Sequence, residues 1–106
     1  MAEIVWTEPA LNDLDAIADT IALDNPDAAR RMVQRIFQHV AQLADHPDSG
    51  PIVPELSVRT YRQIVEPTCR VFYRHDDARV FILHVMRAER LLQPRRLAAR
   101  SRKAGP

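Results

Sequence analysis

Residues 68–86 read TCRVFYRHDDARVFILHVM, and this stretch decides the fold class. Two runs rich in β-branched and aromatic residues, 68–74 and 79–86, are separated by the polar and small residues 75–78. A connection this short joins neighbouring strands only as an antiparallel hairpin. A third run of the same type, 58–65, ends at Glu66-Pro67, so we expect three consecutive antiparallel strands.

The residues that precede this sheet predict one strand and two helices. The short β-type run 4–7 ends at Thr7, which is placed as an N-cap with a proline in the first turn behind it. Apolar residues then recur at steps of three and four as far as Ile21, which is the pattern of an amphipathic helix. Asn25 is placed to cap a second helix of the same kind, which ends near Pro47. We therefore expect an antiparallel helical hairpin.

Together these elements predict an α+β fold: an N-terminal strand, and an antiparallel helical hairpin packed on a small, mainly antiparallel sheet. Residues 87–93 predict a short C-terminal helical segment that ends before Pro94. The basic residues 95–106 predict a mobile tail. A chain of 106 residues is long enough for one hydrophobic core, so we expect a single domain, residues 1–94.

Composition excludes several classes of protein. No apolar run approaches the roughly 18 residues of a membrane span, and the first residues lack the basic and apolar stretches of a secretory signal. We therefore expect a cytoplasmic protein that does not associate with membranes. The single cysteine, Cys69, cannot form an internal disulfide. The four histidines show no metal-ligand spacing, and no glycine-rich phosphate loop is present, so we expect no metal and no cofactor.

The formal net charge of +1 is divided unevenly along the chain. Residues 1–57 carry three arginines against ten acids, a net charge of −7, whereas residues 58–106 carry eleven arginines and one lysine against four acids, a net charge of +8. Such asymmetry indicates a surface that meets an anionic partner, although each half can equally be a solvated exterior. Three of the acids, Asp13, Asp15 and Asp19, lie on the polar face of the first expected helix, where we expect them to be solvated.

Alternation along the strand 68–74 creates one basic face. Arg70 and Arg74 share that face with Phe72, while Cys69 and Tyr73 share the other face. Arginines interleaved with aromatic residues are typical of surfaces that bind RNA phosphates and stack on bases. The alternative is that the aromatic side chains belong to the core.

Four short motifs, in this order along the chain, carry a resemblance to a known family. They are the opening IVWTEPA (4–10), the Asn25-Pro26 corner, the loop 50–56 and the strand segment RVFY (70–73). With the order strand, helical hairpin, three antiparallel strands and terminal segment, the chain resembles the ParE/RelE superfamily of bacterial toxin–antitoxin toxins. The resemblance extends from Ile4 to near Leu92.

This superfamily contains two mechanisms. RelE-like members are ribosome-dependent endoribonucleases that cut messenger RNA with basic strand residues and a late tyrosine. The first and third basic positions of that pattern match Arg62 and Arg70, but the second falls on Ile64, and the late arginine and tyrosine fall near Ala88 and Pro94. Because arginine stays protonated at neutral pH, it is a poor general base, and this pattern favours binding over cleavage.

The ParE-like branch therefore resembles this sequence better. That resemblance implies a toxin that is not an enzyme but binds DNA gyrase, or its DNA complex, and stabilises DNA breaks, with growth inhibition and plasmid stabilization as consequences. We expect basic residues of the sheet and of the segment after it to bind the target: Arg62, Arg70, Arg74, Arg87 and Arg90. Two alternatives stay open. One is a RelE-like ribosome-dependent endoribonuclease whose proton-transfer group is Tyr61, His75 or His84, and the other is a non-toxic member that only binds an antitoxin.

The resemblance also implies a partner. A ParD-like antitoxin, acidic in part, would wrap the toxin in a hetero-oligomer, packing a helix on the hairpin and pairing its backbone with the sheet. We expect apolar positions on the hairpin to receive it: Leu11, Leu14, Val33 and Phe37. The alternative is that these positions are ordinary core against the sheet.

Overall fold

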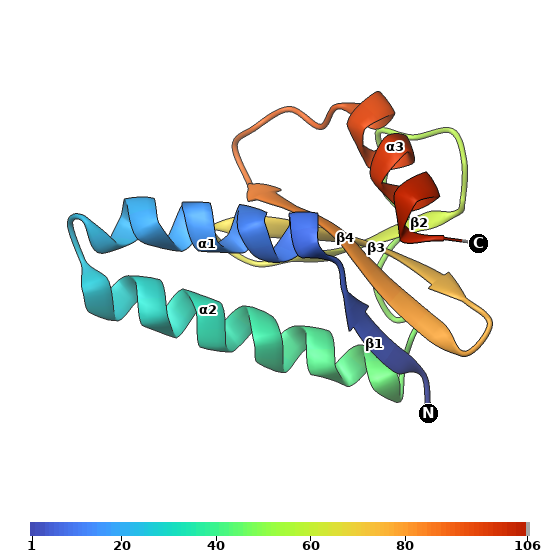
Figure 1. Cartoon of the computed structure of the whole chain (residues 1–106), viewed down its shortest axis with the longest axis horizontal. Helices are drawn as coiled ribbons and strands as arrows, with labels where there is room; N and C mark the ends of the chain where they lie inside the picture. Colours follow the sequence, from blue (N-terminus) through green and yellow to red (C-terminus); the bar gives the residue numbers. More distant parts are fainter. Residues whose placement is uncertain (106) are drawn as a thin grey trace.

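The structure, a computed structural model, describes residues 1–105 and contains an α+β fold (Figure 1). A four-stranded sheet has the order β1-β4-β3-β2. In chain order the elements are β1 (Glu3–Trp6), α1 (Glu8–Ala22), α2 (Pro26–Ala41), a 3₁₀ turn (Gln42–Ala44), β2 (Tyr61–Val65), β3 (Cys69–Asp76), β4 (Arg79–Arg87) and α3 (Pro94–Ala104). The expected fold class, with its helical hairpin and mainly antiparallel sheet, is confirmed; β1 alone pairs in parallel, with β4.

Local capping explains where the two long helices begin. Thr7 Oγ1 accepts a hydrogen bond from the backbone N–H of Ala10, and Asn25 Oδ1 accepts one from the N–H of Ala28. Each cap is followed by a proline in the first turn, where the missing N–H costs nothing. Both caps agree with the sequence prediction. The second helix ends earlier than predicted, at Ala41, because the chain tightens into the 3₁₀ turn before Pro47.

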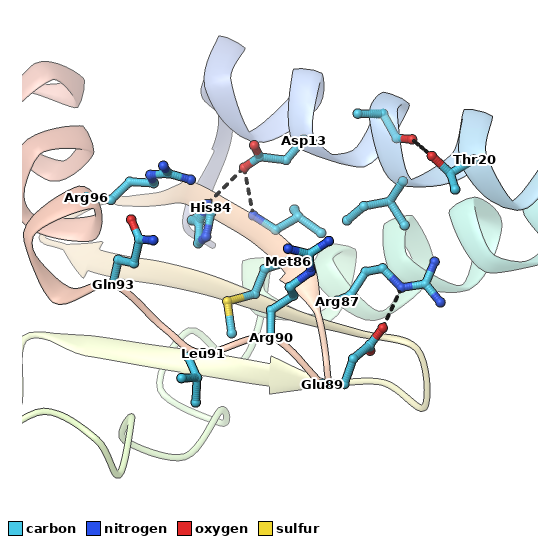
Figure 2. A pocket seen from close by; sticks show the side chains of 13 residues that line it. Asp13, Thr20, His84, Met86, Arg87, Glu89, Arg90, Leu91, Gln93 and Arg96 are labelled. Atoms are coloured by element: carbon cyan, nitrogen blue, oxygen red, sulfur yellow. Dashed lines mark hydrogen bonds and ion pairs between the residues drawn. The ribbon is translucent and has the colours of Figure 1, made fainter.

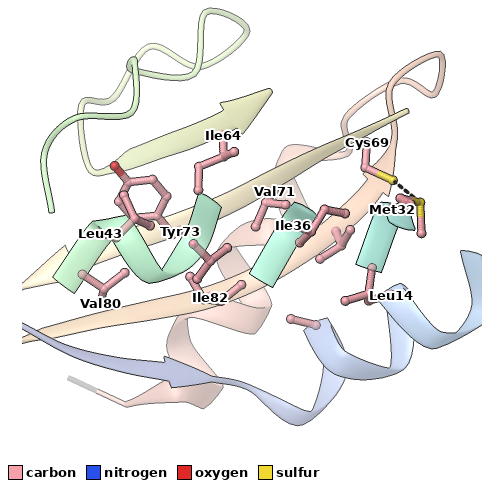
Figure 3. Close-up of a cluster of buried hydrophobic side chains, with 13 residues drawn as sticks. Leu14, Met32, Ile36, Leu43, Ile64, Cys69, Val71, Tyr73, Val80 and Ile82 are labelled. Carbon is pink, nitrogen blue, oxygen red and sulfur yellow. Dashed lines mark hydrogen bonds between the residues drawn. The ribbon is translucent and has the colours of Figure 1, made fainter. Parts of the chain in front are cut away.

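The sheet is covered on both faces. On one face the hairpin of α1 and α2 packs against the larger cluster of buried side chains, which includes Leu14, Ile36 and Tyr73 (Figure 3). On the other face, α3 and the loop before β2 pack against a second cluster through Leu97 and Val53. Figure 1 shows α3 on the side of the sheet away from the hairpin. The sheet is therefore the middle layer of three.

One irregularity in the β3–β4 hairpin changes which side chains share a face. Phe72 lies opposite His84, whereas the next residue, Tyr73, lies opposite Ile82, so Leu83 is an extra residue in β4. The bulge places His84 on the same face as Phe72, and their rings stack with centroids 5.8 Å apart.

The structure corrects the interpretation of the C-terminal residues. Residue 87 ends β4, and residues 88–93 form a turn, a bend and irregular backbone rather than a helix; the segment interpreted as a mobile tail, 95–106, lies within the helix α3 as far as residue 104. Pro94 begins this helix because proline is tolerated at its first position, and Leu97, which is fully buried, fastens it to the sheet. Most basic residues of the helix are exposed, while Arg100 is partly buried and bonds Asp13 of α1, so a high content of basic residues here does not mean a mobile segment. Residue 106 lies outside the described residues.

No helix within residues 1–105 is long and apolar enough to cross a membrane.

Candidate functional site

The five arginines expected to bind the target lie in three separate places. Arg70 and Arg74 lie on the face of β3 that α3 covers, on either side of Phe72. Arg62 lies opposite Tyr73 and therefore faces the other side of the sheet. Arg87 ends β4, and Arg90 follows in the turn after it. The structure thus does not bring these five side chains into one surface.

Arg70 is held by contacts within the chain. Its Nη1 and Nη2 donate to the two carboxylate oxygens of Glu55 at 2.6 and 2.7 Å, and its Nε donates to Oε1 of Gln63 at 2.8 Å. The guanidinium also lies 4.8 Å from the centroid of the Phe72 ring. The hydrogen bonds from Arg70 lower the pKa of Glu55 below its ordinary value. With its five donors largely engaged, Arg70 stabilises the loop before β2.

Arg74 is held by α3. Its Nη1 donates to Oγ and to the backbone oxygen of Ser101, at 2.6 and 2.9 Å, and its Nη2 donates to the backbone oxygen of Gly105 at 2.6 Å. Backbone oxygens near the end of a helix lack partners within the helix, so an arginine is a suitable donor to them. The guanidinium also lies 4.7 Å from the centroid of the Phe81 ring, and the side chain is 11% exposed. Arg74 therefore fastens α3 to the sheet.

Arg62 supports the loop that precedes β2. Its Nη1 donates to the backbone oxygen of Gly50 at 2.9 Å, and its Nε lies 3.6 Å from Asp48. The Tyr73 hydroxyl accepts a hydrogen bond from the backbone N–H of Gly50 at 3.0 Å. These contacts fix the backbone at Gly50 against the side chain of Tyr73.

The remaining two arginines border a groove of about 710 Å³ at the edge of the sheet (Figure 2). We call it the β4 groove; it is lined by one side of α1 (13–20), by the end of β4 (84–87) and by the segment 89–96. It forms because β1 ends opposite Ile82, so the rest of the β4 edge has no neighbouring strand and faces α1 instead. Arg87 contacts only the exposed Glu89, and Arg90 makes no side-chain hydrogen bond or ion pair with residues 1–105.

Asp13 forms the polar wall of this groove. Its carboxylate accepts hydrogen bonds from two nitrogens of Arg100 and from the backbone N–H of Val85, the latter at 3.1 Å, and it lies 3.0 Å from Nδ1 of His84. Burial raises the pKa of Asp13, but the hydrogen bonds from His84, Arg100 and Val85 outweigh it and lower the pKa to about 2. The expectation that Asp13 is a solvated surface acid is therefore wrong, whereas Asp15 and Asp19 are exposed as predicted.

The three candidate proton-transfer groups differ in how far they are engaged. Both ring nitrogens of His75 have partners, Asp48 at Nδ1 and the backbone oxygen of Asp77 at Nε2, each at 2.9 Å. His84 is 7% exposed, and its Nδ1 lies 2.7 Å from Arg100 as well as close to Asp13. Its Nε2 makes no hydrogen bond with residues 1–105. Tyr61 is half-buried and packs against the second cluster.

The apolar positions expected to receive an antitoxin are also divided. Leu14 is 2% exposed and belongs to the core under α1, so its interpretation as an exposed contact is wrong. Leu11 and Val33 are half-buried, and Phe37 is 40% exposed. The ring of Phe37 lies 4.8 Å, centroid to centroid, from that of Trp6. Phe37 is therefore the exposed member of the set, and Leu11, Val33 and the neighbouring Trp6 are half-buried.

Residues 1–105 contain no group of three or more histidine, cysteine or acidic side chains arranged to hold a metal ion. Cys69 is buried, and burial raises the pKa of its thiol. The β4 groove presents Arg90 and Arg96 to an anionic partner, and Nε2 of His84 has no hydrogen-bond partner within residues 1–105.

Comparison with known structures defines the class. The fold matches that of a chain from the chromosomal ParDE toxin–antitoxin system of P. aeruginosa, with a TM-score of 0.70 and 28% identity over 84% of this chain and 98% of that one. It also matches the fold of a chain of the RelBE2 toxin–antitoxin complex from Mycobacterium tuberculosis, with a TM-score of 0.56 and 22% identity over 81% of this chain and 96% of that one. The fold is thus one found in chains of bacterial toxin–antitoxin systems.

Sequence comparison then identifies the family. Residues 4–92 match the family model described as ParE toxin of type II toxin-antitoxin system, parDE, and the chain belongs to this family. The chain is also 38% identical over 92 residues to Toxin RelE2 from Caulobacter vibrioides, covering 86% of this chain and all of that protein. The superfamily resemblance seen in the sequence is confirmed.

Proposed function

We propose that this protein is a ParE-like toxin that binds DNA gyrase, or gyrase on DNA, and stabilises DNA breaks without catalysing a reaction itself. The match of residues 4–92 to the ParE toxin family carries this proposal. The arginines support it, because Arg70 and Arg74 are engaged within the chain and arginine cannot accept a proton at neutral pH. Neither arginine can therefore act as a general base.

Two cations beside the β4 groove are open to a target: Arg90 in the turn after β4 and Arg96 in α3. Arg90 and Arg96 are exposed and make no side-chain hydrogen bond or ion pair within residues 1–105. Target binding through Arg70 or Arg74 would require the loop before β2, or α3, to move first. We therefore place the principal target contacts at Arg90 and Arg96, with Arg87 beside them, rather than at Arg70 and Arg74.

A supercoiling and DNA-cleavage assay with purified gyrase tests this function. We expect the protein to inhibit supercoiling and to trap double-strand breaks, and we expect Arg90→Gln to weaken both effects. Arg31→Gln on α2 is the matched control, because Arg31 is also exposed and its loss removes the same charge. Gyrase that stays fully active at saturating toxin would contradict the proposal.

A RelE-like endoribonuclease is the second candidate. The 38% identity to a protein named Toxin RelE2 favours it, and so does the open Nε2 of His84, since a histidine can transfer protons near neutral pH. Cut messenger RNA in a translating ribosome system, with gyrase unaffected, would establish this reading. In that case His84→Gln should abolish cleavage while His75→Gln should not.

The proposal includes a ParD-like antitoxin that neutralises the toxin in the cytoplasm. The solved structures that share this fold come from toxin–antitoxin systems, which supports an antitoxin partner. We place its contact on the exposed Phe37, with the half-buried Trp6 beside it, and on the half-buried Leu11 and Val33 of the hairpin. Phe37→Ala should weaken antitoxin binding by roughly tenfold or more, because exposed aromatic side chains supply much of the energy of such contacts.

A further inference from the structure

The β4 groove combines an excess of positive charge with one open histidine nitrogen. Three arginines line it, Arg87, Arg90 and Arg96, and a fourth, Arg100, pairs with the lining residue Asp13. They face two carboxylates, and one of these, Asp13, is neutralised by Arg100. Figure 2 shows His84 and Asp13 between Arg96 on one side and Arg90 on the other. The groove is therefore electropositive, and its cations are spread along its length.

Nε2 of His84 opens into this groove. Nδ1 is engaged by Asp13 and Arg100, whereas Nε2 has no partner within residues 1–105. A fully buried side-chain nitrogen or oxygen without a partner occurs at one place in residues 1–105, Nε of Arg74. Nε2 of His84 also lacks a partner but is not fully buried. Nε2 of His84 is therefore accessible, although the residue as a whole is 7% exposed. Because Nδ1 donates to Asp13, Nε2 donates to an anion in the imidazolium form, in which both ring nitrogens carry protons.

The strand edge supplies a further donor. The N–H of Val85 points out of the sheet edge, since it donates to Asp13, and the N–H of Ala88 points inward, since it donates to Thr68. Backbone groups alternate along a strand, so the N–H of Arg87 points outward into the groove, where no strand pairs with it. This N–H, His84 Nε2 and the arginine side chains face the same space.

We propose that the β4 groove binds the backbone phosphates of DNA. This inference rests on the proposed function and deepens it: within a gyrase–DNA complex, the groove contacts the nucleic acid rather than the gyrase polypeptide. Arg90 and Arg96 each pair with a phosphate of one strand, and His84 Nε2, in the imidazolium form, donates to a phosphate between them. Ile17 and Met86 provide an apolar wall for the deoxyribose.

Charge spacing favours DNA over an acidic peptide. Phosphates repeat at every nucleotide along a strand, so cations spread along a groove can each meet one. A polypeptide would need acidic side chains at matching intervals to meet the same cations. The geometry therefore suits a regularly charged strand.

The test measures binding of the full chain to a short fluorescein-labelled DNA duplex by anisotropy, over a series of salt concentrations. We expect the double variant Arg90→Gln/Arg96→Gln to bind at least about tenfold more weakly at low salt. The slope of log K against log salt should fall by about 2, or about 1 for each phosphate contact removed. Both side chains are exposed, so the variant should fold normally, as circular dichroism can verify.

The double variant Arg31→Gln/Arg35→Gln is the matched control. Both arginines are exposed on α2, away from the groove, and the variant loses the same two charges. An equal loss of DNA binding in both double variants would overturn the proposal, because the attraction would then follow net charge alone. Unchanged DNA binding in the groove variant would overturn it as well.

Two further arms identify the source of the anion. A mononucleotide should compete poorly with the duplex; competition at an equal phosphate concentration would mean that the groove binds a free nucleotide and not a strand. If the groove variant keeps its affinity for DNA but loses affinity for DNA-free gyrase, an acidic polypeptide segment is the occupant and the proposal is wrong. In ¹⁵N spectra, inorganic phosphate should shift the His84 Nε2 signal of the native protein but not that of the groove variant.

Failure of this inference can be distinguished from failure of the proposed function. If the groove variant still poisons gyrase and binds DNA as well as the native protein, the phosphate site is disproved and gyrase remains the target. If DNA binding depends on the groove but the native protein has no effect on gyrase, the phosphate site stands and gyrase is not the target.

Discussion

Asp13→Asn tests whether the carboxylate of Asp13 is a structural hub that connects α1 to β4 and α3. In the native protein its carboxylate accepts hydrogen bonds from Arg100 and from the N–H of Val85 and lies beside His84, so it joins α1 to β4 and α3. An amide at this position keeps one acceptor but loses the charge and directs an NH₂ group toward Arg100 or Val85. The Arg100 guanidinium would then lie in a partly buried position without its counter-charge.

The pKa of Asp13 gives the size of the effect. The fall from 3.8 to about 2 corresponds to about 2 kcal/mol of stability that depends on the ionised carboxylate. Because the folded pKa is lowered, this contribution is complete above pH 4 and is lost as the pH falls toward 2. At pH 7 we expect Asp13→Asn to lower the free energy of unfolding by about 2–3 kcal/mol. By pH 3 the difference from the native protein should shrink by about 1 kcal/mol.

Urea unfolding followed by the fluorescence of the single tryptophan, Trp6, measures both quantities. Asp15→Asn is the control. It is the same substitution on the same helix, but Asp15 is exposed and its side chain has no partner within residues 1–105. If Asp13→Asn is as stable as Asp15→Asn at pH 7, or if their difference does not change with pH, the hub is not formed.

Three other changes probe the rest of the structure. Leu97→Ala should lower the free energy of unfolding by about 2–4 kcal/mol, because this side chain of α3 is fully buried against the sheet. Leu91→Ala is the control: its side chain is 91% exposed, and the free energy of unfolding should change by less than about 0.5 kcal/mol. Equal effects of the two variants in thermal unfolding would mean that α3 is not docked. Gly50→Ala should destabilise the protein by about 1–3 kcal/mol, since a Cβ would lie 2.5 Å from the backbone oxygen of Gln63 and 2.7 Å from the Tyr73 hydroxyl. An unchanged melting temperature would show that the loop moves to accommodate the methyl group. Cys69 should resist a thiol reagent such as DTNB at pH 8 until the protein unfolds, because burial both shields the thiol and raises its pKa; rapid labelling of the native protein would contradict its buried position.

Local sequence patterns determined the elements and the family. The caps at Thr7 and Asn25, the apolar spacing of α1 and α2 and the short turn between β3 and β4 depend on neighbours within a few residues, so they are legible without a structure. The motifs that resemble ParE toxins lie in these same elements, and the fold class followed from them.

The partners of the charged residues were decided by tertiary structure. Arg70 and Arg74 are both arginines on one face of β3, yet one supports the loop before β2 and the other fastens α3. The bulge at Leu83 turns His84 toward the groove, and no residue near it in the sequence indicates the shift. The sequence alone could propose that these residues bind a target but could not show which are already engaged.

The chain thus determined by itself where its helices and strands form, because capping and periodicity act over one or two turns of backbone. Only the folded structure decided that Asp13 meets Arg100, a residue 87 positions away, and that the basic residues after Pro94 belong to a docked helix. Contacts at such separations depend on how the layers pack around the sheet. Burial and pairing of charge, which distinguish a structural arginine from one free to bind, exist only once that packing has formed.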